Sequence, residues 1–425
     1  MRNKFLIPVL LLLSVGAGAQ TSRKEMYREP GRTGSNYFAY PGPSRKALTP
    51  APAGYEPFYV SHYGRHGSRY MTSNKYYVQA IGPLDTAARL GLLTSRGKSV
   101  LERLRAGYAD AWNRDGDLTP LGARQHREIA HRMYERFPEL LSQPLQVDAR
   151  SSTVGRCMIS MFNFCQELQG LNPSLDIRMD ASKRDMRFVV EDLHVKPAET
   201  EESPDLEKRL DAIREKSFNP SRLMRLLFTD VRRAGAFVDG PQLMKSLYNV
   251  AQDLQNIPEL GISLMDIFTK DELFAMWTGY NASWLLHSGL IPGSTPMYLQ
   301  QKEVRDSIES VADRVIRQGV PTLTLRFSHD SSVLPLAYMM GLKEAMGGRS
   351  DLEHVYRYIS IDKLIPMAAN IQVVFYRKAG SEGNAPDDIL VKFLLNENET
   401  SIPIATDCAP YYRWTDVKRY WAAHP

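Results

Sequence analysis

Apolar residues occur in short runs that end in polar clusters, which is the pattern of buried strands in an α/β protein. The run at residues 58–63 leads into His66, and the run at residues 322–327 leads into His329. Short apolar runs rich in β-branched and aromatic residues and bounded by turn-forming residues predict strands. Because ligands bind at the carboxyl ends of the strands in open α/β sheets, we expect the two polar clusters to share one crevice.

The same pattern predicts three more strands, at residues 145–149, 371–376 and 389–395. A helix is predicted to begin at Thr119, because its hydroxyl can act as N-cap, Pro120 occupies the first helical position and apolar residues follow at helical spacing. The predicted fold class is therefore α/β, with a three-layer core in which a central, mostly parallel sheet is flanked by helices.

The middle of the chain has mainly helical periodicity. Helices are predicted at 206–216, 221–228 and 242–255. We interpret residues 170–315 as an α-helical cap domain inserted into an α/β core, which residues 55–169 and 316–425 form together. Residues 20–54 are rich in Pro, Gly, Ser and Arg without sustained periodicity, which indicates an extended leader.

Residues 1–19 have the features of a signal peptide. Arg2 and Lys4 precede an apolar run at 5–13, and small residues follow it before Gln20. We therefore expect a periplasmic or secreted protein. The apolar run is shorter than the roughly 20 residues of a membrane span and no longer run follows, so we expect no membrane span after signal cleavage.

The composition is that of a globular protein. Of 425 residues, 43% are hydrophobic, which is enough for a substantial core, and the net charge is only +5. Acidic and basic residues are interspersed, so the charge favours anionic substrates only weakly and does not indicate nucleic-acid binding. The sequence has no phosphate-binding loop of the Walker type, no nucleophile elbow and no dinucleotide fingerprint.

The residues around His66 suit an attack on a phosphoryl group. Arg65 and Arg69 lie on either side of it, and two planar, permanently charged guanidinium groups can hold phosphate oxygens in a fixed orientation. Gly67 has no side chain, so backbone and substrate can approach closely there. The imidazole of His66 is therefore a candidate nucleophile.

The other predicted strand ends supply further candidates. His329 and Asp330 follow the run at 322–327, and Arg150 follows the run at 145–149. A carboxyl group next to a phosphate site is a candidate general acid. Asp330 can also cap the helix that is predicted to follow it.

The order of these motifs resembles that of the histidine acid phosphatase branch of the histidine phosphatase superfamily. The motifs are the loop 65–69, the helix start at 118–122, Arg150-Ser151-Ser152 with Arg156, and His329-Asp330. Residues 69–70, 333–336 and 368–370 are most similar to multiple inositol polyphosphate phosphatases and phytases. Two features differ: Met71 stands where the family commonly has proline, and multiple inositol polyphosphate phosphatases typically carry His-Ala-Glu in place of His-Asp.

The resemblance implies an exported phosphomonoesterase that works through a phosphohistidine intermediate, with inositol polyphosphates such as phytate as candidate substrates. It implies His66 as nucleophile and Asp330 as general acid. Arg65, Arg69, Arg150 and His329 are expected to bind the phosphate. The expected partner is a small phosphomonoester, no cofactor or metal is expected, and the sequence does not predict an oligomeric state.

Two other functions stay open at this point. One is intramolecular phosphoryl transfer, as in the mutases of the same superfamily, against which export argues. The other is a non-catalytic phosphate-ligand binding protein, for which the arginines alone would be sufficient without His66 and Asp330. Arg156 fits either a supporting role in the site or a helix surface. A basic stretch can bind a multiply phosphorylated ligand or form a solvated surface: Arg178, Lys183, Arg184, Arg187 and Lys196.

Neither a metal site nor a disulfide framework is predicted. His126 and His131 are five residues apart, which turns them away from a common helix face, whereas zinc proteases use a spacing of four. Cys157 and Cys165 would lie roughly 12 Å apart on one helix at ~1.5 Å per residue, too far for a bridge. At most one disulfide, involving Cys408, can form, and three buried free thiols are the favoured interpretation.

Overall fold

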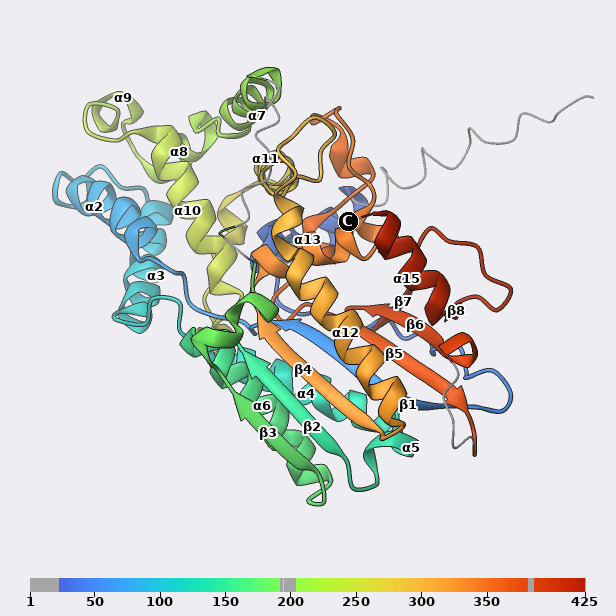
Figure 1. Cartoon of the computed structure of the whole chain (residues 1–425). Coiled ribbons are helices and arrows are strands. Elements are labelled where there is room, and N and C mark those ends of the chain that lie inside the picture. The colour runs from blue at the N-terminus through green and yellow to red at the C-terminus, as the bar shows by residue number, and fades with distance from the viewer. Residues whose placement is uncertain (1–22, 192–193, 195–203, 381–385, 425) are drawn as a thin grey trace, which may run out of the picture.

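The computed structural model describes residues 23–191, 194, 204–380 and 386–424. The predicted signal peptide lies outside the described residues. An eight-stranded sheet forms the centre of the molecule, with strand order β3-β2-β4-β1-β5-β6-β7 and β8 paired to β6 (Figure 1). The strands are β1 Tyr55–Arg65, β2 Gln146–Ser151, β3 Asp176–Asp180, β4 Thr322–Ser328, β5 Asn370–Lys378, β6 Leu390–Leu395, β7 Asn398–Thr400 and β8 Tyr412–Arg413.

The sheet is mixed. The strands β3, β2, β4 and β1 are parallel neighbours, and β5 to β8 continue the sheet as antiparallel strands. Helices cover both faces. One face carries α4 Pro120–Arg136, α5 Pro138–Leu141 and α6 Gly155–Leu171, and the other carries α12 Lys302–Gln318, α13 Asp330–Met339 and α15 Trp414–Ala423 (Figure 1). The predicted α/β class with three layers and the five predicted strands are confirmed.

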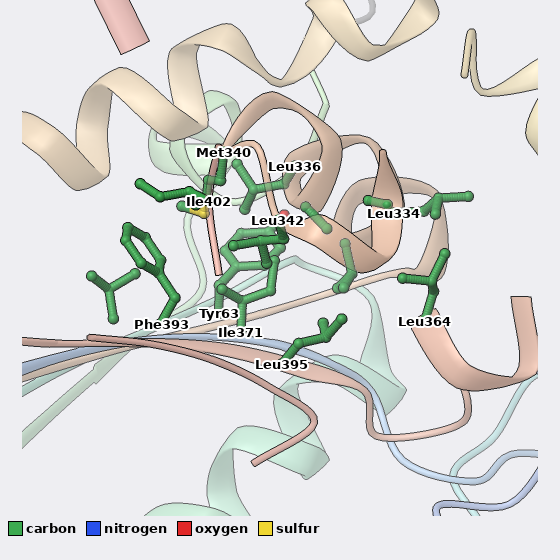
Figure 2. Packing of buried hydrophobic residues seen from close by; sticks show 14 of the residues in the cluster. Tyr63, Leu334, Leu336, Met340, Leu342, Leu364, Ile371, Phe393, Leu395 and Ile402 are labelled. Atoms are coloured by element: carbon green, nitrogen blue, oxygen red, sulfur yellow. The ribbon is translucent and has the colours of Figure 1, made fainter. Parts of the chain in front are cut away.

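Alternation along the strands divides the core into two clusters. Tyr59 and Tyr63 of β1 face α12 and α13, whereas Val60 faces α4 and α6, because successive side chains of a strand point to opposite faces. Figure 2 shows Tyr63, Ile371 and Leu395 rising from the sheet toward the side chains of α13. Burial of each such side chain stabilises the folded state by about 1.5–3 kcal/mol relative to leaving it exposed to solvent.

A third cluster joins helices from two separate parts of the chain. The described α-helices that supply it are α2 Lys75–Arg89, α3 Ser95–Ala111, α8 Ser221–Leu227, α9 Val231–Ala234, α10 Gly240–Leu254 and α11 Lys270–His287. The helix α7 Pro204–Ser217 packs on α11 and, through Leu206 and Leu210, joins the cluster above the sheet. Residues 23–28 are also helical, and further helices are α14 Ile361–Leu364, η1 Pro30–Tyr37, η2 Lys183–Phe188, η3 Pro258–Leu260, η4 Met265–Ile267, η5 Met297–Gln301, η6 Lys343–Ala345, η7 Val355–Arg357 and η8 Pro386–Asp388.

The structure departs from the expected boundaries of core and cap. The helices α2 and α3, which lie within the expected core segment, pack with α8 and α10 in the helical cluster (Figure 1). The strand β3, which lies within the expected cap segment, belongs to the sheet, and the helix α12, most of which lies within that segment, belongs to the layer that covers the sheet. The periodicity of apolar residues identifies a helix or a strand, but it does not show whether that element packs in the α/β core or in the helical cluster.

Two glycines bring α4 into backbone contact with the loop that follows β1. A Cβ at Gly122 would lie 2.2 Å from the carbonyl oxygen of Ser68, and a Cβ at Gly67 would lie 2.4 Å from that of Gly122. Thr119 caps α4 as predicted: its hydroxyl accepts a hydrogen bond from the N–H of Gly122 at 3.2 Å and donates one to Ser68 O at 3.1 Å. Gly67 therefore allows a close approach of backbone to backbone.

Replacing Gly122 by alanine should move α4 away from this loop. We expect Gly122→Ala to lower the free energy of unfolding by about 1–3 kcal/mol, as overpacking of a close contact does. Urea unfolding at neutral pH measures this. The matched control is Gly170→Ala in α6, where nothing lies within 4 Å of the added Cβ; its unfolding midpoint should not fall, and an equal fall in both variants would contradict the proposed contact.

Candidate active site

His66 is held at the end of β1 by backbone hydrogen bonds from both neighbouring segments. Its N–H donates to Ser328 O at 2.9 Å, and its carbonyl accepts from Ala368 N at 3.0 Å. The preceding N–H, that of Arg65, donates to Ala369 O at 2.7 Å. Because β4 and the segment before β5 both fix the backbone, the imidazole has a defined position at the sheet edge.

The His66 ring is buried and arranged as a neutral base. Its Nδ1 lies 2.9 Å from Gly67 O, a carbonyl that can only accept, so Nδ1 carries the proton and Nε2 keeps its lone pair. Burial lowers the pKa of His66 well below its usual range, and the charges of Arg65, Arg69 and Arg156 lower it further. The ring is therefore unprotonated in neutral and mildly acidic solution.

Arg65 is fully buried and forms one side of the site. Its guanidinium donates to the carbonyl oxygens of Ile365, at 2.7 Å, and Asn36, and its Nη2 lies 2.7 Å from Asp330 Oδ2. Burial lowers the pKa of Arg65 to about 10, against the opposing effect of Asp330, so the group keeps its charge at neutral pH.

Arg69 lies across an aromatic ring. Its guanidinium carbon is 4.7 Å from the ring centroid of Tyr37, and its Nη1 donates to Tyr70 O at 2.9 Å and to the Tyr37 hydroxyl at 3.2 Å. Within the described residues its Nε has no hydrogen-bond partner. A buried guanidinium with a free donor is suited to an anion.

His329 and Asp330 stand opposite His66, where β4 passes into α13. The ring centroids of His66 and His329 are 5.7 Å apart with an interplanar angle of 68°. His329 Nε2 lies 3.1 Å from Ser152 Oγ, and burial followed by the charge of Arg156 lowers the pKa of His329. The two histidines, predicted from separate strand ends, are thus brought together in one cluster.

Asp330 is held as a carboxylate. It accepts a hydrogen bond from Asn36 Nδ2 at 2.8 Å in addition to the ion pair with Arg65. Burial alone would raise the pKa of Asp330, but Arg65 and Arg69 outweigh it and bring the pKa to about 2. Asp330 is the first residue of α13, and the N-cap is His329, which makes no side-chain capping hydrogen bond, so the capping role considered for Asp330 is not observed. The predicted proximity of Asp330 to the arginines is observed.

Arg150 does not join this cluster. It forms ion pairs with Asp148 at 2.9 Å, Asp180 at 2.7 Å and Asp185 at 3.5 Å. Alternation explains the difference: Val147 and Ala149 of β2 pack with α6, so Arg150, the next residue, points to the opposite face of the sheet. The expected role of Arg150 in phosphate binding therefore has no support in the structure.

Arg156 takes the place expected for Arg150. It is the second residue of α6, and its Nη2 lies 3.4 Å from His329 Nδ1. Its Nε is buried without a hydrogen-bond partner among the described residues, and burial together with the charge of Arg69 lowers its pKa. The sequence could have indicated Arg156 as a residue of the phosphate site, because it lies at the start of a helix that follows a strand and helix amino termini favour anions.

The leader supplies residues that sequence reasoning missed. The segment η1 places Asn36 against Asp330 and Tyr37 against Arg69. The segment that follows α10 contacts the same region, since Asn256 accepts a hydrogen bond from Ser68 Oγ at 2.7 Å and donates one to Tyr37 O at 3.0 Å. Neither segment has a catalytic motif that would have revealed it.

The histidines and cysteines that were considered for a metal site or a disulfide have structural roles. His126 is buried between Phe164 and Phe327, and His131 contacts Glu167 at 2.9 Å. Within the described part of the chain no group of three or more His, Cys, Asp or Glu is arranged to hold a metal ion. Cys157, Cys165 and Cys408 are free thiols, as predicted, but only Cys157 and Cys165 are buried, whereas Cys408 is partly exposed.

The basic stretch near the start of the expected cap is largely paired. Arg178 contacts Asp176 at 2.8 Å, Arg184 contacts Asp185 at 3.2 Å, and Arg187 lies 3.8 Å from Glu303. These carboxylates reduce the local positive charge, so the solvated-surface interpretation fits the arginines better. Lys196 lies outside the described residues.

The whole chain has similarities to known enzymes. No family model matches the chain. It is 22% identical over 452 residues to multiple inositol polyphosphate phosphatase 1 of Gallus gallus, across 99% of this chain and 93% of that protein. The structure of Bifidobacterium longum multiple inositol polyphosphate phosphatase in complex with inositol hexasulfate matches with a TM-score of 0.76 and 20% identity, covering 92% of this chain and 98% of the other.

A second solved structure, the phytase from D. castellii, matches with a TM-score of 0.69 and 15% identity over 93% of this chain and 85% of the phytase. These similarities confirm the fold class and the predicted resemblance to histidine acid phosphatases. Among the described residues no helix has both the length and the apolar character required to cross a membrane.

Two buried histidines, His62 in β1 and His126 in α4, should make stability depend on pH. Burial lowers the pKa of His62 and of His126 to about 3. The unfolded chain binds these protons near pH 6.5 and the folded chain does not, so the free energy of unfolding should fall as pH drops from about 6.5 toward 3, by up to about 1.4 kcal/mol per pH unit for each histidine.

The test is urea unfolding of the wild type and His126→Leu at pH 7.5 and pH 4.5. The stability difference between them should shift in favour of the variant by roughly 2–3 kcal/mol at the lower pH. Measurement at pH 7.5 serves as the control for packing effects, because both imidazoles are neutral there in both states. A constant difference would show that His126 binds a proton in the folded protein.

Proposed function

We propose that the chain is a phosphoric monoester hydrolase of the histidine acid phosphatase type, with His66 as nucleophile and Asp330 as proton donor. The observation that carries the proposal is the neutral His66 imidazole among three guanidinium groups, Arg65, Arg69 and Arg156, with a carboxyl group opposite. The positive groups favour a bound phosphate and lower the pKa of the nucleophile at the same time.

In the proposed reaction the His66 Nε2 lone pair attacks phosphorus as the bond from phosphorus to the alcohol oxygen breaks. The departing oxygen takes a proton from Asp330, and a phosphohistidine results. Water then attacks phosphorus, gives its proton to Asp330 and releases phosphate, which restores the His66 lone pair. The arginines and His329 would stabilise the charge on the transferring group.

Asp330 must hold a proton when the ester is bound. In the free protein Arg65 and Arg69 keep it ionised, with a pKa of about 2. A bound phosphate dianion shares these guanidinium charges and adds negative charge beside the carboxyl, so it raises the pKa of Asp330. This coupling favours protonation of the acid in the complex and turnover in acidic solution.

The nature of the substrate is supported by the relatives. The Gallus gallus and Bifidobacterium longum proteins are named multiple inositol polyphosphate phosphatases, and the D. castellii protein is named a phytase. A cavity of about 500 Å³ between α7, α10 and α11 is lined by Arg214, Lys245 and Asp211, and Asp211 lies 3.2 Å from Arg214. The lining therefore has one more basic than acidic side chain, which favours anionic groups. We therefore propose inositol polyphosphates such as phytate as substrates.

The proposed export of the protein supports hydrolysis over the two alternative functions, a mutase and a binding protein. The features of residues 1–19 support a signal peptide and a periplasmic or secreted enzyme. A mutase serves metabolites inside the cell, and a binding protein would not require the neutral His66 with a carboxyl group facing it. Hydrolysis is the function that uses every group of the cluster.

The function is tested by release of inorganic phosphate from phytate, a sugar phosphate and an aryl phosphate. The wild type should release phosphate from them, and His66→Ala should lose at least about 10³-fold in kcat, since no group replaces the nucleophile. Circular dichroism should show the same fold in both proteins. Full activity of His66→Ala would refute the nucleophile, and wild-type binding of phosphate without turnover would indicate a binding protein.

Arg156 and Arg150 form a matched pair of substitutions. Arg156→Ala should raise KM and lower kcat/KM by roughly 10²-fold or more, the loss of a charge-assisted contact to phosphate in a buried site. Arg150→Ala should leave kcat/KM within about twofold, because its guanidinium is paired with Asp148 and Asp180 on the other face of the sheet. Steady-state kinetics with an aryl phosphate measure kcat/KM for both variants. A larger loss of kcat/KM in Arg150→Ala than in Arg156→Ala would support the phosphate-binding role first expected for Arg150.

A further inference from the structure

The side chain of Tyr37 lies beside the charged cluster around His66. Its ring stacks on Arg69, with the guanidinium carbon 4.7 Å from the ring centroid, and its hydroxyl accepts a hydrogen bond from Arg69 Nη1 at 3.2 Å. Arg69 is buried, whereas Tyr37 is partly exposed. Tyr37 is therefore a neighbour of the buried guanidinium that solvent still reaches.

The backbone around Tyr37 is held in place from several sides. Asn256 Nδ2 donates to Tyr37 O at 3.0 Å, and the carbonyl oxygen of Asn36 accepts from the guanidinium of Arg65. Ser35 has a φ of 55° and a ψ of −124°, a conformation that residues with a side chain rarely adopt. Strained backbone of this kind persists where the surrounding contacts impose it, and it is frequent at functional sites. The direction of the Tyr37 ring is thus fixed by its surroundings.

The phenol lies within electrostatic range of all three guanidinium groups of the site. Burial lowers the pKa of Arg65 and that of Arg156, and Tyr37 is among the groups that oppose this effect. Burial also acts to lower the pKa of Arg69, but Tyr37 and Asp330 outweigh it, so that this pKa lies above its usual value. An anion held by these guanidinium groups would therefore lie near the Tyr37 hydroxyl.

The Tyr37 hydroxyl has a donor without an acceptor. Arg69 occupies one lone pair of the oxygen, and among the described residues no acceptor lies within hydrogen-bond distance of the O–H. Guanidinium groups only donate, so the arginines cannot accept this proton. An external oxygen atom is required, and phosphoryl oxygens are the acceptors that arginines bind best. Because the phenol accepts from a cation, its O–H is polarised and donates more strongly.

We propose that Tyr37 is a further substrate-binding residue, whose hydroxyl donates a hydrogen bond to a non-bridging oxygen of the phosphoryl group while its ring supports Arg69. The assignment of the anion as the substrate's phosphoryl group rests on the proposed function. All phosphomonoesters share this group, so the contact assists every substrate to a similar extent. The residue that provides it comes from the leader, far in sequence from the other phosphate-binding residues.

Tyr37→Phe removes the hydroxyl and keeps the ring on Arg69. The value of kcat/KM should fall about tenfold to a hundredfold, the effect of one hydrogen bond to a charged group, both for p-nitrophenyl phosphate and for glucose 6-phosphate. The matched control is Tyr27→Phe, because the Tyr27 hydroxyl lies in the same leader but contacts Arg23 and Asp271 at the surface. This control should keep kcat/KM within about twofold, and an equal loss in both variants would overturn the inference.

The same substitution in the Arg69→Ala background separates a direct contact from an effect that passes through Arg69. If the hydroxyl itself binds the phosphoryl group, Tyr37→Phe should still lower kcat/KM by about threefold or more in that background. A loss that disappears there would show that the hydroxyl only positions Arg69, and would overturn the proposed contact. Circular dichroism should show the wild-type fold in each variant.

Binding of inorganic phosphate, measured by isothermal titration calorimetry, needs no turnover. A Kd that rises about tenfold or more in Tyr37→Phe supports the contact even if no ester is hydrolysed, in which case only the proposed function fails. Hydrolysis by the wild type with unchanged kcat/KM and Kd in Tyr37→Phe overturns the inference and leaves the function intact. A wild-type protein that neither binds phosphate nor hydrolyses an ester overturns both.

Discussion

The parallel pairing of β1 with β4 is the constraint on which the site depends. The register places Arg65 opposite Ser328, so the residues that follow each of them, His66 and His329, leave the sheet side by side. The hydrogen bond from His66 N to Ser328 O belongs to the same ladder. A change of one residue in this register would send the two imidazoles to different faces.

The second requirement is charge compensation. Arg65 is fully buried and the side chain of Asp330 is only 14% exposed, and an isolated charge in such a position is strongly unfavourable. Each lowers the cost of the other, and Asn36 and Ile365 satisfy part of the remaining hydrogen-bonding capacity. The result is a site that has net positive charge and is still compatible with a folded core.

The extent to which sequence predicted this arrangement differs from residue to residue. His66, His329 and Asp330 could be placed because each directly follows an apolar strand, and Thr119 because a cap has a local chemical signature. Arg150 was misplaced because it lies within its strand, where one position decides the face, while Arg156 lies beyond it at a helix start. Asn36 and Tyr37 could not be placed, because their contacts depend on how a segment without periodicity folds back over the molecule.

That folded-back leader has a consequence for how the protein matures. The segment η1 lies between α10, α11 and α14 and reaches both Asp330 and Arg69. Asn36 and Tyr37 lie 17 and 18 positions after Ala19, the last of the small residues at which the sequence predicts that a signal peptidase would cut. Proteolysis that removed the chain as far as Tyr37 would therefore also remove the contacts to Asp330 and Arg69, so the position of the amino terminus would affect the candidate active site directly.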